Sequence, residues 1–523
     1  GIGKSALVQE FVRTSKVRME VIRAESRPYL QHAAFGFIMD FVRDFAKLNV
    51  DDRSDETLRR LSDALGARVP DPESRETILK AFRPILDSRP EEDNALQNWG
   101  VFVTRALEIL LGSIGQTKPL LAVFEDVQWA DEQSKRALQE ILERGRLRGP
   151  ILFLFTGRER SDFPQFFLQG GAIHLHAFDE EKARRFVISR FASPEQAQPL
   201  VESIIANGEG NPFYLNEMLA SLVDTGVCRV EGPERKLVPV RQIAAELDVK
   251  AFPTLEGILS ARLDALEPEL RRILRIAAVL GRKFSKAALD AACGEDTGPA
   301  LEIFVRKQLI RPLENAGRYS FTQSIMRDYC YASLPEEERR EAHRIQAETI
   351  LASPGYKPAI DDVIVARHLE LSGQRQRAAQ YYLASAHHAR RFGANANQEA
   401  LSHYQKVLEL VPDDPESVFH VHRDREWIWR NMGMRAEQFE EIRAMQQLAG
   451  KTGNLRWRAE ALCRELAYCQ ETGESQKTTE LYPEAYRAAQ EAGDPSSQVE
   501  VMRIHARAKV DRGELDGALA LLQ

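Results

Sequence analysis

Three groups of residues in this chain have the types and spacing needed for chemistry on a phosphorylated ligand. The first is Gly1-Ile2-Gly3-Lys4-Ser5, the second half of the loop pattern G-x-x-x-x-G-K-[ST]. In such a loop the backbone N–H groups surround a phosphate, and the following helix directs its positive end at it. We expect Gly1 to Ala6 to contact nucleotide, with Lys4 on the β/γ oxygens and Ser5 on Mg²⁺.

The second group is a pair of carboxylates after a strand-like run. Pro119 to Phe124 is apolar and ends in Glu125-Asp126. Buried parallel strands deliver ligand-binding side chains at their carboxyl ends. One carboxylate can hold Mg²⁺ while its neighbour orients the attacking water. We expect Glu125 to share Mg²⁺ with Ser5, and Asp126 to position water; an ordinary acidic turn is the alternative.

The third group is the tip of another apolar run. Ile151 to Phe155 precedes Thr156-Gly157-Arg158, and Arg158 is in a position to sense the γ-phosphate. The elements around these groups read as a helix over Ala6–Arg13, a strand near Met19–Ile22, and a fourth apolar segment at Ala172–Leu175. Strands that alternate with helices predict an α/β fold, a parallel sheet covered on both faces.

Several further segments carry a resemblance to a known family, the STAND ATPases (signal-transduction ATPases with numerous domains). The matches run in the family's order from residue 1 to about residue 350. Each is short, but together they form a specific pattern. The matching segments are E-D-V-Q-W-A-D at 125–131, G-N-P-F-Y-L-N-E at 210–217, L-S-A-R-L-D-A-L at 259–266, I-A-A-V-L-G-R-K-F at 276–284, and the pair Y-S-F-T-Q at 319–323 with Y-A-S-L at 331–334.

The resemblance implies an ATP-binding, slowly hydrolysing regulatory switch that uses ATP/ADP and Mg²⁺. The chain resembles the bacterial branch of the family, which is found in transcriptional activators, class III adenylate cyclases and kinase-linked regulators. An effector domain is therefore expected outside this sequence. The resemblance also implies that Pro212 contacts the adenine or the lid. Gln323 stands where the family has a histidine, and as a neutral donor it would hold ADP more weakly.

Four regions follow from the pattern. Residues 1–178 form the P-loop core, with irregular helices expected over the polar stretch 51–92. Residues 179–249 form a helical lid that continues into a linker from Cys228. Residues 250–335 read as a winged helix, with a hairpin made by 309–313 and 318–321. The resemblance implies that this winged helix packs on the nucleotide domain rather than on DNA.

Residues 336–523 carry glycines in one register. The interval between them is 20 residues or twice that, and the segments between them have helical patterns. A glycine at each helix end predicts helical hairpins of about 40 residues, similar to tetratricopeptide (TPR) repeats. Such an array offers a surface for a protein or a small-molecule inducer. The glycines are Gly373, Gly393, Gly433, Gly453, Gly473, Gly493 and Gly513.

Composition limits the remaining possibilities. The net charge of −7 argues against wholesale nucleic-acid binding by this chain, so nucleic acid would be reached through the missing effector. The five cysteines lack metal-ligand spacing and are expected as free thiols in a reducing cytoplasm. No apolar run is long enough for a bilayer, so no membrane contact is expected.

The sequence also reads as a piece cut at both ends. It begins inside the phosphate loop, and Leu515 to Gln523 reads as an unfinished helix, so the piece alone could be inactive. The resemblance implies homo-oligomers in the active state. Two other functions stay open: an AAA-type motor or DNA-processing ATPase, and a non-catalytic TPR scaffold with a relic P-loop.

Overall fold

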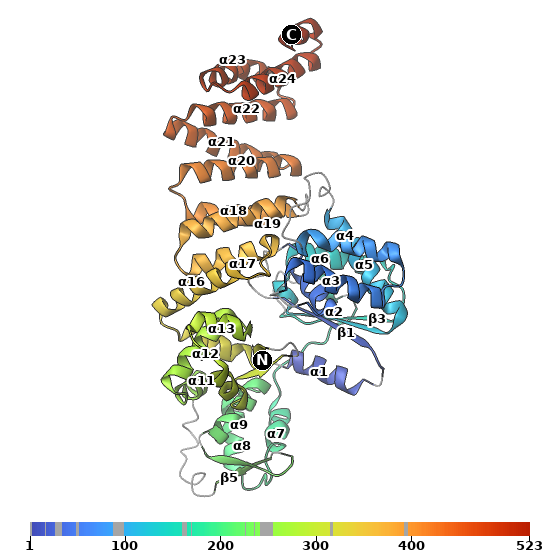
Figure 1. The fold of residues 1–523 in the computed structure, drawn as a ribbon, viewed down its shortest axis with the longest axis vertical. Coiled ribbons are helices and arrows are strands. Elements are labelled where there is room, and N and C mark those ends of the chain that lie inside the picture. The colour runs from blue at the N-terminus through green and yellow to red at the C-terminus, as the bar shows by residue number, and fades with distance from the viewer. Residues whose placement is uncertain are drawn as a thin grey trace.

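The structure is a computed structural model, and it places a compact α/β unit beside a long stack of helices (Figure 1). Gly1 and Ile2 lie outside the part of the chain that it describes. The described residues are 3–15, 17–26, 34–48, 52–86, 99–158, 165–168, 170–224, 226–234, 236–240, 255–313, 317–391 and 396–522.

The α/β unit is built on a parallel sheet. Strands β1 (Glu20–Glu25), β2 (Leu120–Glu125) and β3 (Ile151–Phe155) lie in the order β1-β2-β3. Residue 25 pairs with residue 125, so the carboxyl ends of β1 and β2 meet at one edge. The three sequence-predicted strands are therefore confirmed.

The fourth apolar segment is not a strand. Residues 171–179 have no regular structure, and Ile173 is 82% exposed. Its apolar residues are few and His174 interrupts them, so they bury too little surface to hold a place in the sheet. The fourth apolar segment, Ala172–Leu175, therefore adds no strand to the sheet.

Helices cover both faces of the sheet. On one face, Val8 of α1 (Lys4–Thr14) packs on Leu121 and Val123 of β2. On the other, the ring of Phe124 stacks on Phe41 of α2 (Gly36–Ala46) at 5.3 Å between centroids. The remaining elements of the unit are α3 (Ser54–Arg68), α4 (Pro72–Leu86), α5 (Trp99–Thr117), η1 (Val127–Trp129), α6 (Glu132–Arg144) and η2 (Gln165–Leu168).

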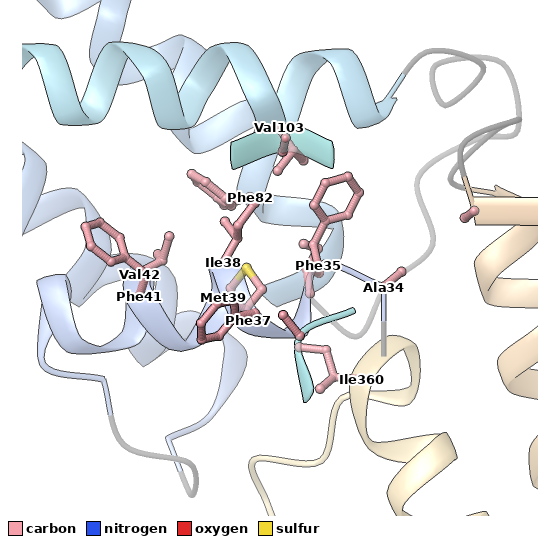
Figure 2. Packing of buried hydrophobic residues seen from close by; sticks show 14 of the residues in the cluster. Ala34, Phe35, Phe37, Ile38, Met39, Phe41, Val42, Phe82, Val103 and Ile360 are labelled. Atoms are coloured by element: carbon pink, nitrogen blue, oxygen red, sulfur yellow. The ribbon is translucent and has the colours of Figure 1, made fainter. Parts of the chain in front are cut away.

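The insertion expected to hold irregular helices is more ordered than that. Its described residues form α3 and α4, two regular helices that bury Leu61, Leu65 and Phe82 in the same core as α2 (Figure 2). Pro84 cannot donate to the carbonyl of residue 80, but it lies in the last turn of α4, so the helix ends two residues later and only its final turn is affected.

The segment expected to form the helical lid, called the lid below, contains α7 (Glu180–Ile188), α8 (Gln198–Asn207) and α9 (Pro212–Asp224). The expected linker holds a hairpin, β4 (Cys228–Glu231) with β5 (Lys236–Pro239). Gly210 has φ +65°, and a Cβ there would lie 2.0 Å from the carbonyl oxygen of Phe178. The Phe178 N–H donates to the Gly210 carbonyl at 2.7 Å. The glycine of the G-N-P segment is thus required by close backbone contact.

The next region has the elements expected of a winged helix. The hairpin predicted at 309–313 and 318–321 is present as β7 (Ile310–Pro312) and β8 (Arg318–Phe321), and a third strand, β6 (Lys283–Ser285), pairs with β8. Leu274, Phe304 and Phe321 lie in a core of its own. The helices are α11 (Leu255–Asp264), α12 (Pro268–Leu280), α13 (Lys286–Cys293), α14 (Gly298–Arg306) and α15 (Ser324–Ala332).

A helical array follows, as the glycine register predicted. Six of the seven glycines have φ between 64° and 85°, the left-handed conformation of a helix C-terminus, and Gly393 lies outside the described residues. The helices are α16 (Glu336–Ala352), α17 (Pro358–Leu371), α18 (Arg375–Arg391), α19 (Asn397–Leu410), α20 (Pro415–Met432), α21 (Arg435–Thr452), α22 (Leu455–Glu471), α23 (Ser475–Glu491), α24 (Pro495–Asp511) and α25 (Leu515–Leu522).

The first helices of the array pack directly on the α/β unit (Figure 1). Figure 2 shows Ile360 of α17 in the same cluster as Phe35 and Phe37. The Lys357 ammonium donates to the carbonyl of Asp52 at 3.3 Å. One continuous apolar core therefore joins the two parts, a contact that the sequence pattern did not predict.

Candidate functional site

The predicted phosphate and Mg²⁺ residues meet at the carboxyl edge of the sheet. Ser5, the second residue of α1, donates its hydroxyl to Glu125 Oε2 at 2.9 Å, and Arg23 Nη1 lies 3.5 Å from Glu125 Oε1. Gly3 has φ +97°, and no side chain caps the first turn of α1. The N–H groups of a first helical turn have no partner within the helix. Together with a hydroxyl and a carboxylate, they suit a phosphate with Mg²⁺.

Asp126 is held in an unusual backbone conformation next to this pair. Its φ is +55°, which is uncommon for a residue other than glycine. Gln128 Nε2 lies 3.4 Å from Asp126 Oδ1, and the N–H of Arg158 donates to Gln128 Oε1 at 3.1 Å. Gln128 thus connects the Asp126 carboxylate to the tip of β3, and the structure brings Ser5, Glu125, Asp126 and Arg158 to one edge.

Asp131 is a structural residue of this site to which the sequence assigned no role. It is 1% exposed and accepts three backbone hydrogen bonds, from Phe35 at 3.0 Å, Phe37 at 3.0 Å and Ser134 at 2.8 Å. Burial raises the pKa of Asp131, and the three donors oppose that shift. The available signal was its position just before α6, where aspartate is a preferred helix cap.

Two predicted nucleotide residues lie on other elements. Pro212 is the first residue of α9, and Gln323 immediately precedes α15. No hydrogen bond or ion pair among the described residues joins either one to Lys4, Ser5 or Glu125. The structure therefore does not bring these two residues into the group at the sheet edge.

A further contact at this edge joins the winged-helix region to the sheet. Glu25, the last residue of β1, accepts from Arg282 Nη1 at 2.8 Å and also pairs with the Lys283 ammonium. Glu25 is the in-register neighbour of Glu125, the carboxylate expected to bind Mg²⁺. These two basic residues belong to the A-A-V-L-G-R-K-F segment, in which the sequence assigned them no role.

The lid is tied to the winged-helix region by a second ion pair. Arg262 Nη1 of α11 donates to Glu217 Oε2 of α9 at 2.6 Å, and both side chains are nearly buried. Glu217 ends the G-N-P-F-Y-L-N-E segment and Arg262 begins R-L-D-A-L. The ion pair therefore joins two segments between which the sequence predicted no contact.

Two further features are absent from the described part of the chain. Across those residues, no cluster of three or more His, Cys, Asp or Glu side chains could hold a metal ion. None of the described helices has the length and apolar content to cross a bilayer. The five cysteines are free thiols, as predicted.

The parallel sheet, Gly3 before α1 and the carboxylates at the end of β2 have the arrangement of a P-loop NTPase fold. Residues 1–154 match the family described as AAA ATPase domain, which confirms the predicted fold of this part. The chain is also similar to the crystal structure of a STAND protein with a tetratricopeptide repeat sensor from Pyrococcus horikoshii. That match has 11% identity and a TM-score of 0.38, and it covers 99% of this chain and 76% of that one. No curated protein matches.

Proposed function

We propose that the chain is the nucleotide-dependent regulatory switch of a signalling ATPase of the STAND type. ATP or ADP with Mg²⁺ binds at the carboxyl edge of the sheet and is hydrolysed slowly. The helical array receives a protein or small-molecule signal, and an effector carried elsewhere in the protein gives the output. The active form assembles into homo-oligomers.

The roles of the site residues in this proposal follow from their positions. Lys4 holds the phosphates, and Ser5 with Glu125 holds Mg²⁺, which polarises the phosphoryl oxygens when bound. Asp126 orients the attacking water, while Gln128 keeps its carboxylate in place. Arg158 senses the γ-phosphate from the end of β3. Pro212 and Gln323 reach the nucleotide from the lid and the winged-helix region.

The observation that carries the proposal is the ion-pair cluster at Glu25. Glu25 binds Arg282 and Lys283 and is in register with Glu125, the proposed Mg²⁺ ligand, so a change at the phosphates can change the contact between the two parts. Added phosphate charge competes with Glu25 for Arg282 and Lys283 through Coulombic attraction. A ligand that binds the two arrangements with different affinity shifts the population between them.

The contact can be tested through nucleotide release. In full-length protein, Glu25→Gln removes the charge from both ion pairs, so the winged-helix region should separate more easily. Two partly buried pairs at up to about 1 kcal/mol each predict release of a fluorescent ADP analogue faster by up to roughly thirtyfold. Stopped-flow fluorescence measures this rate.

Arg272→Ala is the matched control. Arg272 pairs with Glu269 and Glu295, and these partners lie within the winged-helix region. The variant removes ion pairs of similar number without touching the sheet, so release should keep the wild-type rate. Equal rates in wild type and Glu25→Gln would show that this contact does not hold the nucleotide site closed.

A further inference from the structure

The seam between the helical array and the α/β unit contains a buried acid on α19. Glu399 is 4% exposed, in the third position of that helix. Among the described residues, neither carboxyl oxygen has a hydrogen-bond partner of good geometry. The donor that acts on it is the backbone N–H of Gln133, near the start of α6 in the α/β unit. The acid thus points from the array at the helix that follows the catalytic carboxylates.

The charges facing Glu399 come from the other side of the seam. They are the acids Asp131 and Glu132, which disfavour a second negative charge, and Arg136, which favours it. Gln133 is 2% exposed, so water has little access to this place. An ionised carboxylate here would lose its hydration and gain little in exchange.

A second buried acid of the seam differs in this respect. Asp361 of α17 accepts the Lys357 N–H at 2.7 Å, and Arg43 of α2 lies across from it. Its carboxylate therefore has both a donor and a nearby cation. Glu399 has neither a well-placed donor nor a dominant cation, so its surroundings oppose its ionisation more strongly than those of Asp361 do.

We propose that Glu399 makes docking of the helical array on the α/β unit dependent on pH, with its carboxyl group protonated in the docked state. The array is held most firmly when Glu399 carries its proton. Loss of the proton places an uncompensated charge in the seam and favours separation of α19 from α6. This pH dependence requires no nucleotide at the sheet edge, so it goes beyond the nucleotide-dependent function.

The direction of the pH dependence follows from linkage. Burial, then Asp131 and Glu132, raise the pKa of Glu399 well above its usual range in the docked state. An exposed glutamate in the separated state has a pKa near 4.3. Docking is therefore strongest below about that value, weakens as pH rises toward the raised pKa, and is constant above it.

Hydrogen exchange tests the proposal on the full-length protein. Protection factors of the α6 and α19 amides, corrected for intrinsic exchange, should fall between about pH 5 and pH 8 by up to tenfold per unit of pH. Glu399→Gln keeps the size of the side chain and cannot ionise. In that variant the fall should disappear, and protection near pH 8 should exceed that of the wild type.

Two controls separate docking from general instability. Amides of α22 to α24, far from the seam in the array (Figure 1), should show the same protection in both proteins. Adding Gln398→Glu to the variant restores the net charge at an exposed neighbour and should leave the profile flat. The same pH profile in wild type and Glu399→Gln would overturn the proposal, and so would a wild-type profile without a fall.

Discussion

Replacing Asp131 with alanine should lower the free energy of opening of the α/β unit by about 3 kcal/mol or more. The substitution leaves three buried backbone N–H groups without an acceptor, and each such group costs about 1–3 kcal/mol. Asp131 follows β2 and binds the backbone at the start of α2. The loss of protection should therefore be largest for the β2 amides. A chain of several domains is not expected to unfold in a single transition. Hydrogen exchange of the Leu120–Glu125 amides in denaturant therefore measures the free energy of opening of this unit.

Two comparison variants sharpen this prediction. Asp131→Asn keeps one acceptor oxygen but turns an amide group toward a backbone donor, so it should be intermediate. Asp179→Ala removes another helix cap, one that is exposed and accepts from a single backbone N–H, and should cost only about 1 kcal/mol locally. Equal costs for Asp131→Ala and Asp179→Ala would mean that the buried network is not a principal support of the unit.

Replacing Asp126 with asparagine should slow ATP hydrolysis by about a hundredfold or more and leave nucleotide affinity nearly unchanged. Asparagine has the same shape but cannot accept a proton from the attacking water, and positioned acid–base groups contribute roughly 10²–10⁴-fold. The hydrogen bond from Gln128 can still be made to the remaining oxygen. Single-turnover hydrolysis of labelled ATP by full-length protein, with a parallel binding titration, separates the two effects.

Asp63→Asn serves as the control for that experiment. Asp63 lies on the exposed side of α3 and pairs weakly with Arg59, at 3.4 Å. Its substitution makes the same chemical change away from the sheet edge, so hydrolysis should be unaffected. If Asp126→Asn turns over at the wild-type rate, another group positions the water and the role assigned to Asp126 is wrong.

The elements that carry the site could be predicted because their signals are local. Apolar runs before Glu125 and Arg158 gave β2 and β3, and the glycines of the array marked helix ends that have the expected left-handed conformation. The same rule failed at Ala172–Leu175, where the apolar run is short and has no neighbour to cover it.

The contacts between parts of the chain could not be predicted, since they depend on packing across long sequence separations. Glu25 meets Arg282 across 257 positions, and Glu399 acts on α6 from a different region of the fold. Each of these residues looks like an ordinary surface charge in the sequence. Their roles appear only when the helical array and the winged-helix region are placed against the sheet.

The most direct test of the proposed function is the identity of the nucleotide that purified full-length protein retains. The protein is denatured and the released small molecules are separated and identified, beside a Lys4→Ala variant and an Arg13→Ala control, whose side chain pairs with exposed Glu10 on the same helix. A resting switch predicts tightly held ADP in wild type and Arg13→Ala, and its loss in Lys4→Ala. Absence of nucleotide from all three proteins, with no effect of added ATP on their assembly, would contradict the switch and leave a helical scaffold.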